Sequence, residues 1–398
     1  MTASIGSELR PSLPHLPAAL DEMEDITVAS GDIIVYRLFE LADRIDLDLA
    51  EKHWQTHTGS LGARRTFQAT PPKAIAYNVP PVVLTLDPVS LTLNKSDQTT
   101  QTVQAQATAR LYDIGIVTLT LRFAVTHLSW QDYAALLNDI NRSIGPTSGS
   151  MLWRDMLRAL RGPLDGALHN PIDTTLEEDY IIAFVRAFDR PLTGKQILET
   201  IDLVPLLSGE TLPLSERARQ DLLRNNFSYY IDDLAVLTWD RGLVVDPRGD
   251  SDVLDVVEVA NAQLLEISYF NKLLNDELPR MYTLVQTTHR SSGLWSSRRL
   301  SGLARNLYTL YAEVTEVKEH VDNVLTVTED VYLARIYGAA VALFQVNVVS
   351  HAVEEKLSII RETYMALYDD ASGGRAEAME IAVVALITME IILTLIHW

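Results

Sequence analysis

The stretch TVQAQATARLYDIGIVTLTLRFAVT, Thr102–Thr126, decides the fold class of this chain. Apolar and polar residues alternate along most of it, which is typical of strands with one buried face. Asp113 and Gly115 interrupt the alternation and indicate a turn or a bulge. The stretch therefore predicts two strands joined at that point, within a β-rich region that extends over residues 26–145.

Predicted helices and further strands flank this pair of strands. Upstream, IIVYRLF at Ile33–Phe39 predicts a strand, and a helical stretch follows through about Trp54. Downstream, Ser129 is a good N-cap for a helix through Ile140. Residues 26–145 therefore form a first α+β unit. The 25 residues before it are Pro-rich and acidic, without the basic and apolar segments of a secretory signal, and we expect a disordered tail.

A similar order of elements returns in residues 146–250. Asp179–Phe188 predicts a strand and Thr193–Leu206 a helix. Phe227–Tyr230 and Leu234–Val245 predict paired strands. The fold class expected for both units is α+β, with helices on one face of a mixed sheet. Sequence identity does not establish whether the two units are repeats.

Residues 251–370 change to a helical texture. Apolar residues recur at alternating steps of three and four along three segments, which is the spacing of a helix–helix seam. We expect an antiparallel hairpin or bundle packed within the chain, and intermolecular coiled-coil contact is the alternative. The three seams are Val257, Ala260, Leu264, Ile267, Asn271, Leu274, Leu278, Met281 and Val285; Leu300, Leu303, Leu307, Leu310, Val314, Val317, Val321 and Val324; and Val353, Leu357, Ile360, Tyr364 and Leu367.

The chain ends in the apolar run IAVVALITMEIILTLIHW, Ile381–Trp398. Its length as a helix is about 27 Å, against a hydrocarbon core of about 30 Å, and a start before Ile381 supplies the difference. Arg375 and Trp398 suit the two interfaces of a bilayer, and Glu390 inside the run suits an oligomer contact. Residues 375–398 therefore predict a C-terminal transmembrane anchor; a buried helix in an oligomer core is the alternative.

Charge and composition limit the partners. The chain has 33 Lys and Arg against 53 Asp and Glu, a net charge of −20, which argues against a general nucleic-acid binder. With no cysteine, disulfides, Cys-zinc sites and thiol catalysis are excluded. An acid-free window between Glu277 and Glu313 predicts a patch for an anionic partner, unless its arginines pair with acids elsewhere. These arginines are Arg280, Arg290, Arg298, Arg299 and Arg305.

Motifs for catalysis are weak. His53 and His57 lie one helical turn apart, a spacing that zinc can use, but Trp54 between them indicates a packing surface and H-E-x-x-H is absent. The acids at positions 246, 250, 252 and 255 miss the EF-hand spacing and fit a turn followed by a helix cap. The sequence therefore predicts no catalytic residue, no cofactor and no metal beyond the two weak histidine candidates.

Four stretches carry a family resemblance: NNFSYYIDDLAVLTWDRGLVVDP, LEISYFNKLLNDELPRMY, VEEKLSIIRETYMALYDD and RAEAMEIAVVALITMEI. In these stretches the chain resembles the RMD1/YagE family, also called DUF155, over about Asp179–Trp398. The resemblance implies an α+β domain, a helical hairpin and one C-terminal membrane anchor. It also implies membrane-attached scaffolding, seen in mitochondrial members connected with organelle translation. It carries over no catalytic residue.

These observations predict a membrane-tethered, non-enzymatic scaffold that oligomerises through its helical region. The expected partners are the lipid bilayer, further copies of the chain and a protein of unknown identity. The expected location is a bacterial inner membrane, with the rest of the chain in the cytoplasm. Two alternatives stay open: a metal-dependent enzyme built on the α+β domain, and an oligomeric membrane protein related to ion transport.

Overall fold

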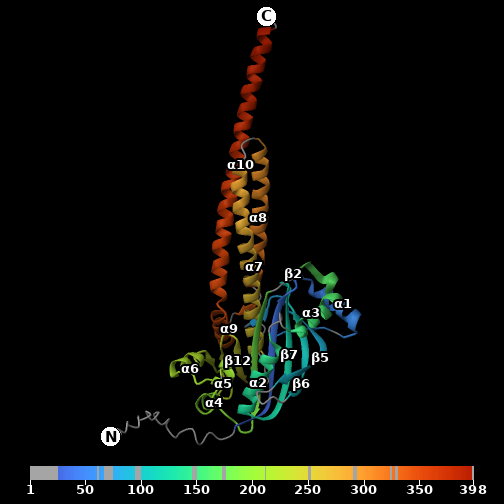
Figure 1. Cartoon of the computed structure of the whole chain (residues 1–398), viewed down its shortest axis with the longest axis vertical. Helices are drawn as coiled ribbons and strands as arrows, with labels where there is room; N and C mark the ends of the chain where they lie inside the picture. Colours follow the sequence, from blue (N-terminus) through green and yellow to red (C-terminus); the bar gives the residue numbers. More distant parts are fainter. Residues whose placement is uncertain are drawn as a thin grey trace, which may run out of the picture.

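The computed structural model describes residues 26–396, except residues 61, 67–74, 95–99, 146–149, 173–175, 211, 250–251, 290–293, 323–324 and 328–329. The expected tail, residues 1–25, lies outside the described residues. A large sheet with flanking helices forms one end of the molecule, and long helices leave it toward the C-terminus (Figure 1). The predicted α+β class is therefore confirmed.

One nine-stranded sheet carries the α+β domain, in the order β10-β11-β12-β9-β1-β7-β6-β5-β3. Stretches 26–145 and 146–250, expected as two units, both contribute to it, because β9 pairs with β1 at its centre. β12 runs parallel to β9 and β1 runs antiparallel to both neighbours, so the sheet is mixed. The strands are β1 Thr27–Glu40, β3 Ala63–Arg64, β5 Val82–Asn94, β6 Thr100–Leu111, β7 Ile116–Ser129, β9 Glu177–Phe188, β10 Asn226–Phe227, β11 Leu234–Leu237 and β12 Arg241–Val245.

The predicted turn at Asp113–Gly115 is confirmed, since it joins β6 to β7. Gly115 has φ +95°, a conformation that only glycine adopts without strain. A Cβ atom there would lie 1.9 Å from the carbonyl oxygen of Ala42. Leu41 also donates its N–H to the Gly115 carbonyl at 2.9 Å. The turn therefore fits against the chain that leaves β1.

Helices cover both faces of the sheet, not one face as expected. Ile33 and Val35 of β1 point into one core, while Ile34 and Tyr36 point into another. A strand buried on both sides is apolar at nearly every position, and IIVYRLF fits this except at Arg37, which pairs with Glu177. The first face carries α1 Leu47–Thr58, α2 Trp130–Ile144, α3 Met151–Leu164, α4 Gly194–Thr200 and α5 Val204–Ser208; the second carries the start of α7 Asp252–His289 and α9 Val331–Leu343.

Several smaller elements complete the domain. The helix expected over Thr193–Leu206 is divided into α4 and α5, because Ile201 has an extended backbone and Pro205 lies in the first turn of a new helix. The remaining elements are α6 Glu216–Leu222, the 3-10 turn η2 Asp165–Ala167, and two short ribbons: β2 Ala42–Ile45 with β8 Leu168–Pro171, and β4 Ile75–Tyr77 with β13 Leu325–Val327.

The helical region is a bundle of α7, α8 Leu294–Asp322 and α10 Val346–Ile396 (Figure 1). Its core contains residues from all three predicted seams, so these seams pack within the chain. Lys356 of α10 donates a hydrogen bond to Asn271, the polar residue of the first seam. The core residues are Ile267, Phe270, Leu274, Met281, Ala304, Leu307, Val314, Val353, Leu357, Ile360 and Leu367.

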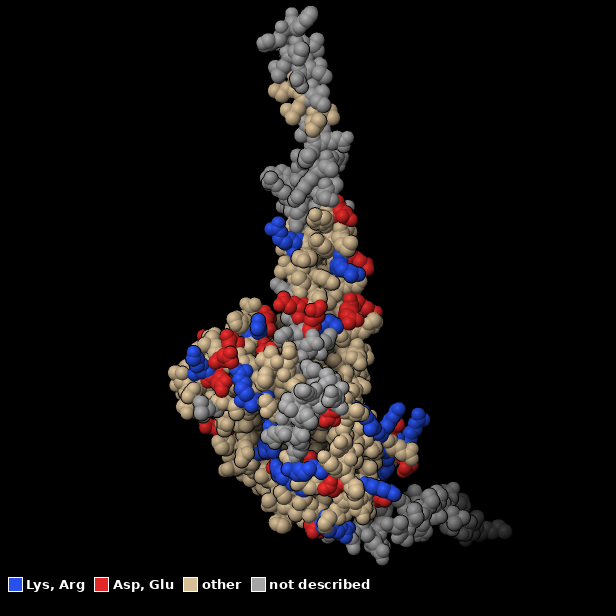
Figure 2. Space-filling model, turned by 180° about the vertical axis from the view of Figure 1, so that it is seen from behind, with Lys and Arg blue, Asp and Glu red and all other residues tan. Residues whose placement is uncertain are grey.

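Helix α10 is the longest element, at 51 residues. It runs beside α7 and α8 and then continues past the tip of their hairpin (Figure 1). Its backbone stays helical through Ala371–Gly374, which the sequence indicated as a linker. Acidic side chains gather around the base of the bundle, where it leaves the α+β domain (Figure 2).

Candidate functional site

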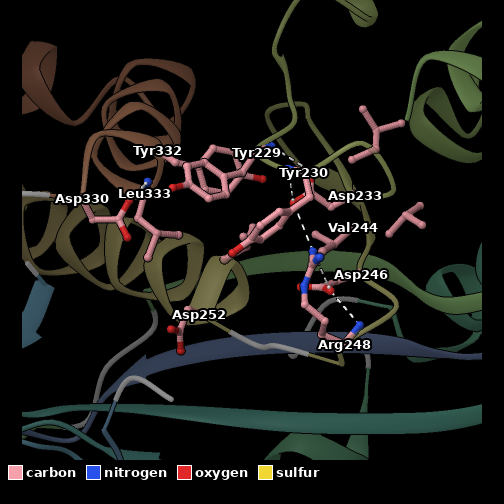
Figure 3. Close-up of a pocket in the computed structure, with 13 residues that line it drawn as sticks. Tyr229, Tyr230, Asp233, Val244, Asp246, Arg248, Asp252, Asp330, Tyr332 and Leu333 are labelled. Atoms are coloured by element: carbon pink, nitrogen blue, oxygen red, sulfur yellow. Dashed lines mark hydrogen bonds and ion pairs between the residues drawn. The ribbon is translucent and has the colours of Figure 1, made fainter. Parts of the chain in front are cut away.

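A pocket of about 280 Å³ lies where the end of the sheet meets the first turns of α7 and α9 (Figure 3). Strands β11 and β12, the loop before β11 and the turn after β12 supply one side. The two helices supply the other. Its lining consists of Tyr229, Tyr230, Asp233, Leu234, Val244, Val245, Asp246, Arg248, Asp252, Val253, Asp330, Tyr332 and Leu333.

The loop between β10 and β11 places two tyrosine rings at the pocket. The carboxylate of Asp233 accepts hydrogen bonds from the backbone N–H groups of Tyr229, at 2.8 Å, and Tyr230, at 3.1 Å. Such a side-chain acceptor replaces the ladder partners that a loop lacks. The rings are 65% and 53% exposed, and their centroids are 4.8 Å apart in an edge-to-face arrangement. Asp233 thus holds the loop while the rings stay accessible.

Arg248 joins this loop to the turn after β12. Its guanidinium lies 4.1 Å from the centroid of the Tyr230 ring, a cation–π contact. It also pairs with Asp246 at 3.1 Å, Asp233 at 3.2 Å and Asp232 at 3.3 Å. Burial alone would lower the pKa of Arg248, and these three carboxylates raise it instead. The arginine therefore stays charged and ties the two segments together.

Helix α9 provides the opposite wall. Asp330 caps it by accepting a hydrogen bond from the Leu333 N–H at 2.9 Å. The Tyr332 ring lies 5.4 Å from that of Tyr229. Burial, followed by the charges of Asp233 and Asp246, raises the pKa of Tyr332. The pocket thus combines ring faces, carboxylates and an apolar floor, and its described lining holds no Ser, His, Cys or Lys. This chemistry suits binding.

A second feature is a pair of buried carboxyl groups, Glu40 at the end of β1 and Glu266 in α7. Each residue is 1% exposed, and in the described part of the chain neither Oε2 has a hydrogen-bond partner. Burial, followed by the charges of Glu266 and Asp43, raises the pKa of Glu40 to about 10. Burial and Asp43 likewise raise the pKa of Glu266. Glu40 is therefore protonated at neutral pH.

The predicted acidic turn has two roles. The carboxylate of Asp246 accepts the Arg248 N–H at 2.9 Å and forms the expected turn, while Asp252 opens α7; residue 250 lies outside the described residues. Asp255 is buried and pairs with Arg65 at 2.8 Å and Arg110 at 3.0 Å, a role that the sequence did not indicate. Glu258 extends this buried network, since it pairs with Arg110 at 2.9 Å.

The two candidate zinc histidines lie on α1, as expected, but they have other contacts. His57 Nδ1 lies 2.9 Å from the carbonyl oxygen of His53, within its own helix. Trp54 between them is buried in the core, which agrees with a packing surface. Among the described residues, no group of three or more His, Cys, Asp or Glu side chains is placed to hold a metal ion.

Two arginines of the predicted anionic-partner patch can be placed. Arg280 pairs with Glu277 in the preceding turn of α7 at 2.6 Å, and Arg305 is exposed on α8. The side chains of Arg290, Arg298 and Arg299 lie outside the described residues. The described residues therefore do not test whether the five arginines form one patch.

The predicted anchor falls largely outside the described side chains: those of Arg375 and Glu390 are not described, and neither is Trp398. Within the described residues, none of the helices taken singly has the length and apolar content to cross a bilayer. The bent pair Val331–Leu343 and Val346–Asp369, which turns by 62°, has both when its two helices are counted together.

The sequence did not single out the pocket. The sequence predicted a strand over Phe227–Tyr230, but β10 ends at Phe227, and Tyr229 and Tyr230 lie in the loop that follows. A local signal was present: adjacent Tyr229 and Tyr230 precede an Asp-Asp pair in a segment too polar to be a core strand. The contribution of Tyr332 had no such signal, because α9 lies about a hundred residues further along.

The fold and the pocket define an α+β protein with a pocket between its mixed sheet and the first turns of α7 and α9. Residues 30–252 match a family described as uncharacterized protein MJ0711, N-terminal domain. Because this match covers more than half of the 398 residues, the chain belongs to that family. The family match spans the sheet and the first residue of α7.

One relative is the uncharacterized protein MJ0711 of Methanocaldococcus jannaschii. It is 27% identical over 194 residues, which is 48% of this chain and 58% of the relative. The chain is therefore matched to somewhat more than half the length of that relative. No solved structure matches the chain.

Proposed function

We propose that this protein is a membrane-tethered, non-enzymatic scaffold of the RMD1/YagE type that oligomerises through its helical region. The observation that carries the proposal is the far end of α10. This helix passes the tip of the α7–α8 hairpin (Figure 1). Large apolar side chains in its far part are exposed. Those with described positions are Val383, Val384, Leu386 and Met389.

An apolar helix beyond its own bundle needs a cover, because exposed apolar area costs about 25 cal/mol per Å². The segment Ile381–Ile396 spans about 24 Å as a helix, close to the hydrocarbon thickness of a bilayer. A bilayer covers all sides of a single helix, whereas a second copy covers only one face. The bilayer is therefore the better cover, and the apolar composition of the segment supports it.

The bundle supplies a surface for self-association. Tyr308 on α8 and Tyr368 on α10 are exposed, and both rings approach Tyr364, at 5.5 and 6.1 Å between centroids. Met365, the residue after Tyr364 on α10, is also exposed. Exposed aromatic and Met side chains of this kind are enriched in protein interfaces. We therefore place the oligomer contact on the α8–α10 side of the bundle.

Membrane fractionation followed by carbonate extraction tests the tether. We expect the full chain to remain with the membrane and a chain ending at Asp370 to be released. In the full chain, Leu386→Arg with Met389→Arg should also release the protein, whereas Met365→Arg, on the bundle, should not. Release of the unaltered full chain by carbonate would refute the tether.

Self-association has a separate test: light scattering of the detergent-solubilised chain. We expect an oligomer for the unaltered chain and a smaller species for Tyr308→Glu with Tyr368→Glu. Tyr229→Glu, at the pocket, is the matched control and should leave the oligomer intact. A monomeric unaltered chain would contradict this part of the proposal without affecting the tether.

A further inference from the structure

The polar lining of the pocket described above carries mostly negative charge. Four carboxylates, of Asp233, Asp246, Asp252 and Asp330, line it together with one guanidinium, of Arg248. Arg248 is already engaged by Asp233, Asp246 and the neighbouring Asp232. The N-termini of α7 and α9 add about half a positive charge each, which still leaves a surplus of negative charge. The pocket therefore favours a positively charged ligand.

The aromatic wall favours the same sign of charge. The faces of tyrosine rings carry partial negative charge and attract cations. Arg248 shows this within the pocket, since its guanidinium lies 4.1 Å from the centroid of Tyr230. The rings of Tyr229 and Tyr332 are 5.4 Å apart, across the pocket from Arg248 (Figure 3). Tyr229 is exposed and Tyr332 is half-buried, and their accessible ring faces offer a second place for a cationic group.

The floor and the volume limit the rest of the ligand. Leu234, Val244 and Val245 of the sheet, with Val253 and Leu333 of the helices, form an apolar floor. Apolar floors of this kind bind aliphatic groups by removing both surfaces from water. The volume of about 280 Å³ is at the low end for ligand pockets, which span about 300–1,000 Å³. It suits a small molecule or a single long side chain.

We propose that this pocket binds an organic cation with an aliphatic stem: a guanidinium or ammonium group on a short chain of methylenes. The cation lies against Tyr229 and Tyr332, near the carboxylate of Asp330, and the stem lies on the apolar floor. Such a group occurs as a free alkyl cation or as an Arg or Lys side chain of a partner protein. The site is independent of the membrane tether, because its lining belongs to the α+β domain and to the first turns of α7 and α9.

Isothermal titration calorimetry of the full chain in detergent tests this, with two matched pairs of probes. Butylguanidinium is compared with butylurea, its neutral isostere. The blocked tripeptide Gly-Arg-Gly is compared with Gly-citrulline-Gly, which differs only in the charged group. We expect each cation to bind at least about tenfold more tightly than its neutral counterpart. Tighter binding of the peptide points to a protein side chain, and tighter binding of butylguanidinium to a free cation.

Two variants locate the binding. Asp330→Asn removes the charge but keeps a good N-cap for α9, so the helix start should survive. Tyr229→Leu removes an exposed ring that the core does not need. We expect each to weaken binding of the cations by about fivefold. The control Tyr282→Leu, at a residue that is exposed on α7 and does not line the pocket, should leave the affinity unchanged.

Three outcomes would overturn the proposal. The first is the absence of saturable binding by either cation up to about 10 mM. The second is equal affinity for the charged and neutral members of both pairs. The third is unchanged affinity in Asp330→Asn and Tyr229→Leu, provided that both variants keep the thermal midpoint of the unaltered chain to within a few degrees.

Discussion

Replacement of Glu40 by Gln should stabilise this protein at neutral pH. Glu40 and Glu266 meet where β1 ends against α7, and each is 1% exposed. A buried carboxylate without compensating partners is costly, so the folded state keeps the proton on Glu40. Glutamine has nearly the same shape and needs no proton. The substitution therefore removes the cost of protonation and little else.

The magnitude follows from the shift in pKa. Burial and the nearby acids raise the pKa of Glu40 from 4.5 to about 10. Between these values the folded chain holds a proton that the unfolded chain has lost, so stability falls as pH rises. The contribution of Glu40 to the free energy of unfolding is most favourable below the unfolded pKa of 4.5, and it decreases as the pH rises toward the folded pKa of about 10. Each pH unit above the unfolded pKa of 4.5 costs about 1.36 kcal/mol of folding free energy, so retention of the proton costs roughly 3 kcal/mol at pH 7.

Urea unfolding of the full chain at about pH 5.5, 7 and 8.5, followed by far-ultraviolet circular dichroism, measures this effect. We expect the gain in unfolding free energy of Glu40→Gln over the unaltered chain to grow by about 1.4 kcal/mol per pH unit. Glu199→Gln is the matched control, because Glu199 is an exposed partner of Lys195. Its effect should stay within about 0.5 kcal/mol at every pH.

The reasoning would be refuted by a Glu40→Gln variant that loses stability at pH 7 and above. That result would mean that Glu40 is ionised in the folded state and has a cationic partner. A gain that does not change with pH would also contradict it, since the stabilisation would then come from packing and not from the proton.

Three further predictions concern the α+β domain. Asp255→Ala leaves Arg65 and Arg110 without their shared buried carboxylate and should cost about 3–5 kcal/mol, measured by urea unfolding. Gly115→Ala should abolish soluble expression of the folded domain, because φ is +95° and the new Cβ would lie 1.9 Å from the Ala42 carbonyl oxygen. Tyr133→Phe removes the buried hydrogen bond from the hydroxyl to the Asp32 carbonyl oxygen, at 2.8 Å, and should lower the thermal midpoint through a loss of about 1 kcal/mol.

Local sequence signals predicted the secondary structure well where they were strong. The alternation of Thr102–Thr126 and its turn correspond to β6 and β7, and described residues of all three seams lie in the bundle core. Short elements were harder: β13 has three residues and lies outside any periodic pattern. Periodicity needs about two turns of helix or four strand residues to show a face.

For the candidate sites, local sequence signals were poor guides. His53 and His57 had a recognisable spacing, yet that spacing serves a helix surface whose Trp54 is buried in the core. The pocket residues had almost no spacing signal, because Tyr229 and Tyr332 are about a hundred positions apart. Their rings come within 5.4 Å only after α9 packs against the sheet.

Single-residue chemistry and short-range periodicity are encoded along the chain, so the sequence by itself determined the α+β class, the helical seams and the apolar run at Ile381–Trp398. Tertiary structure alone decided that β9 and β12 join β1 in one sheet, that helices cover both of its faces, and that Glu40 meets Glu266. The physical reason is that these features depend on contacts between distant segments. Burial and charge at such contacts are properties of the packed chain, and no local pattern carries them.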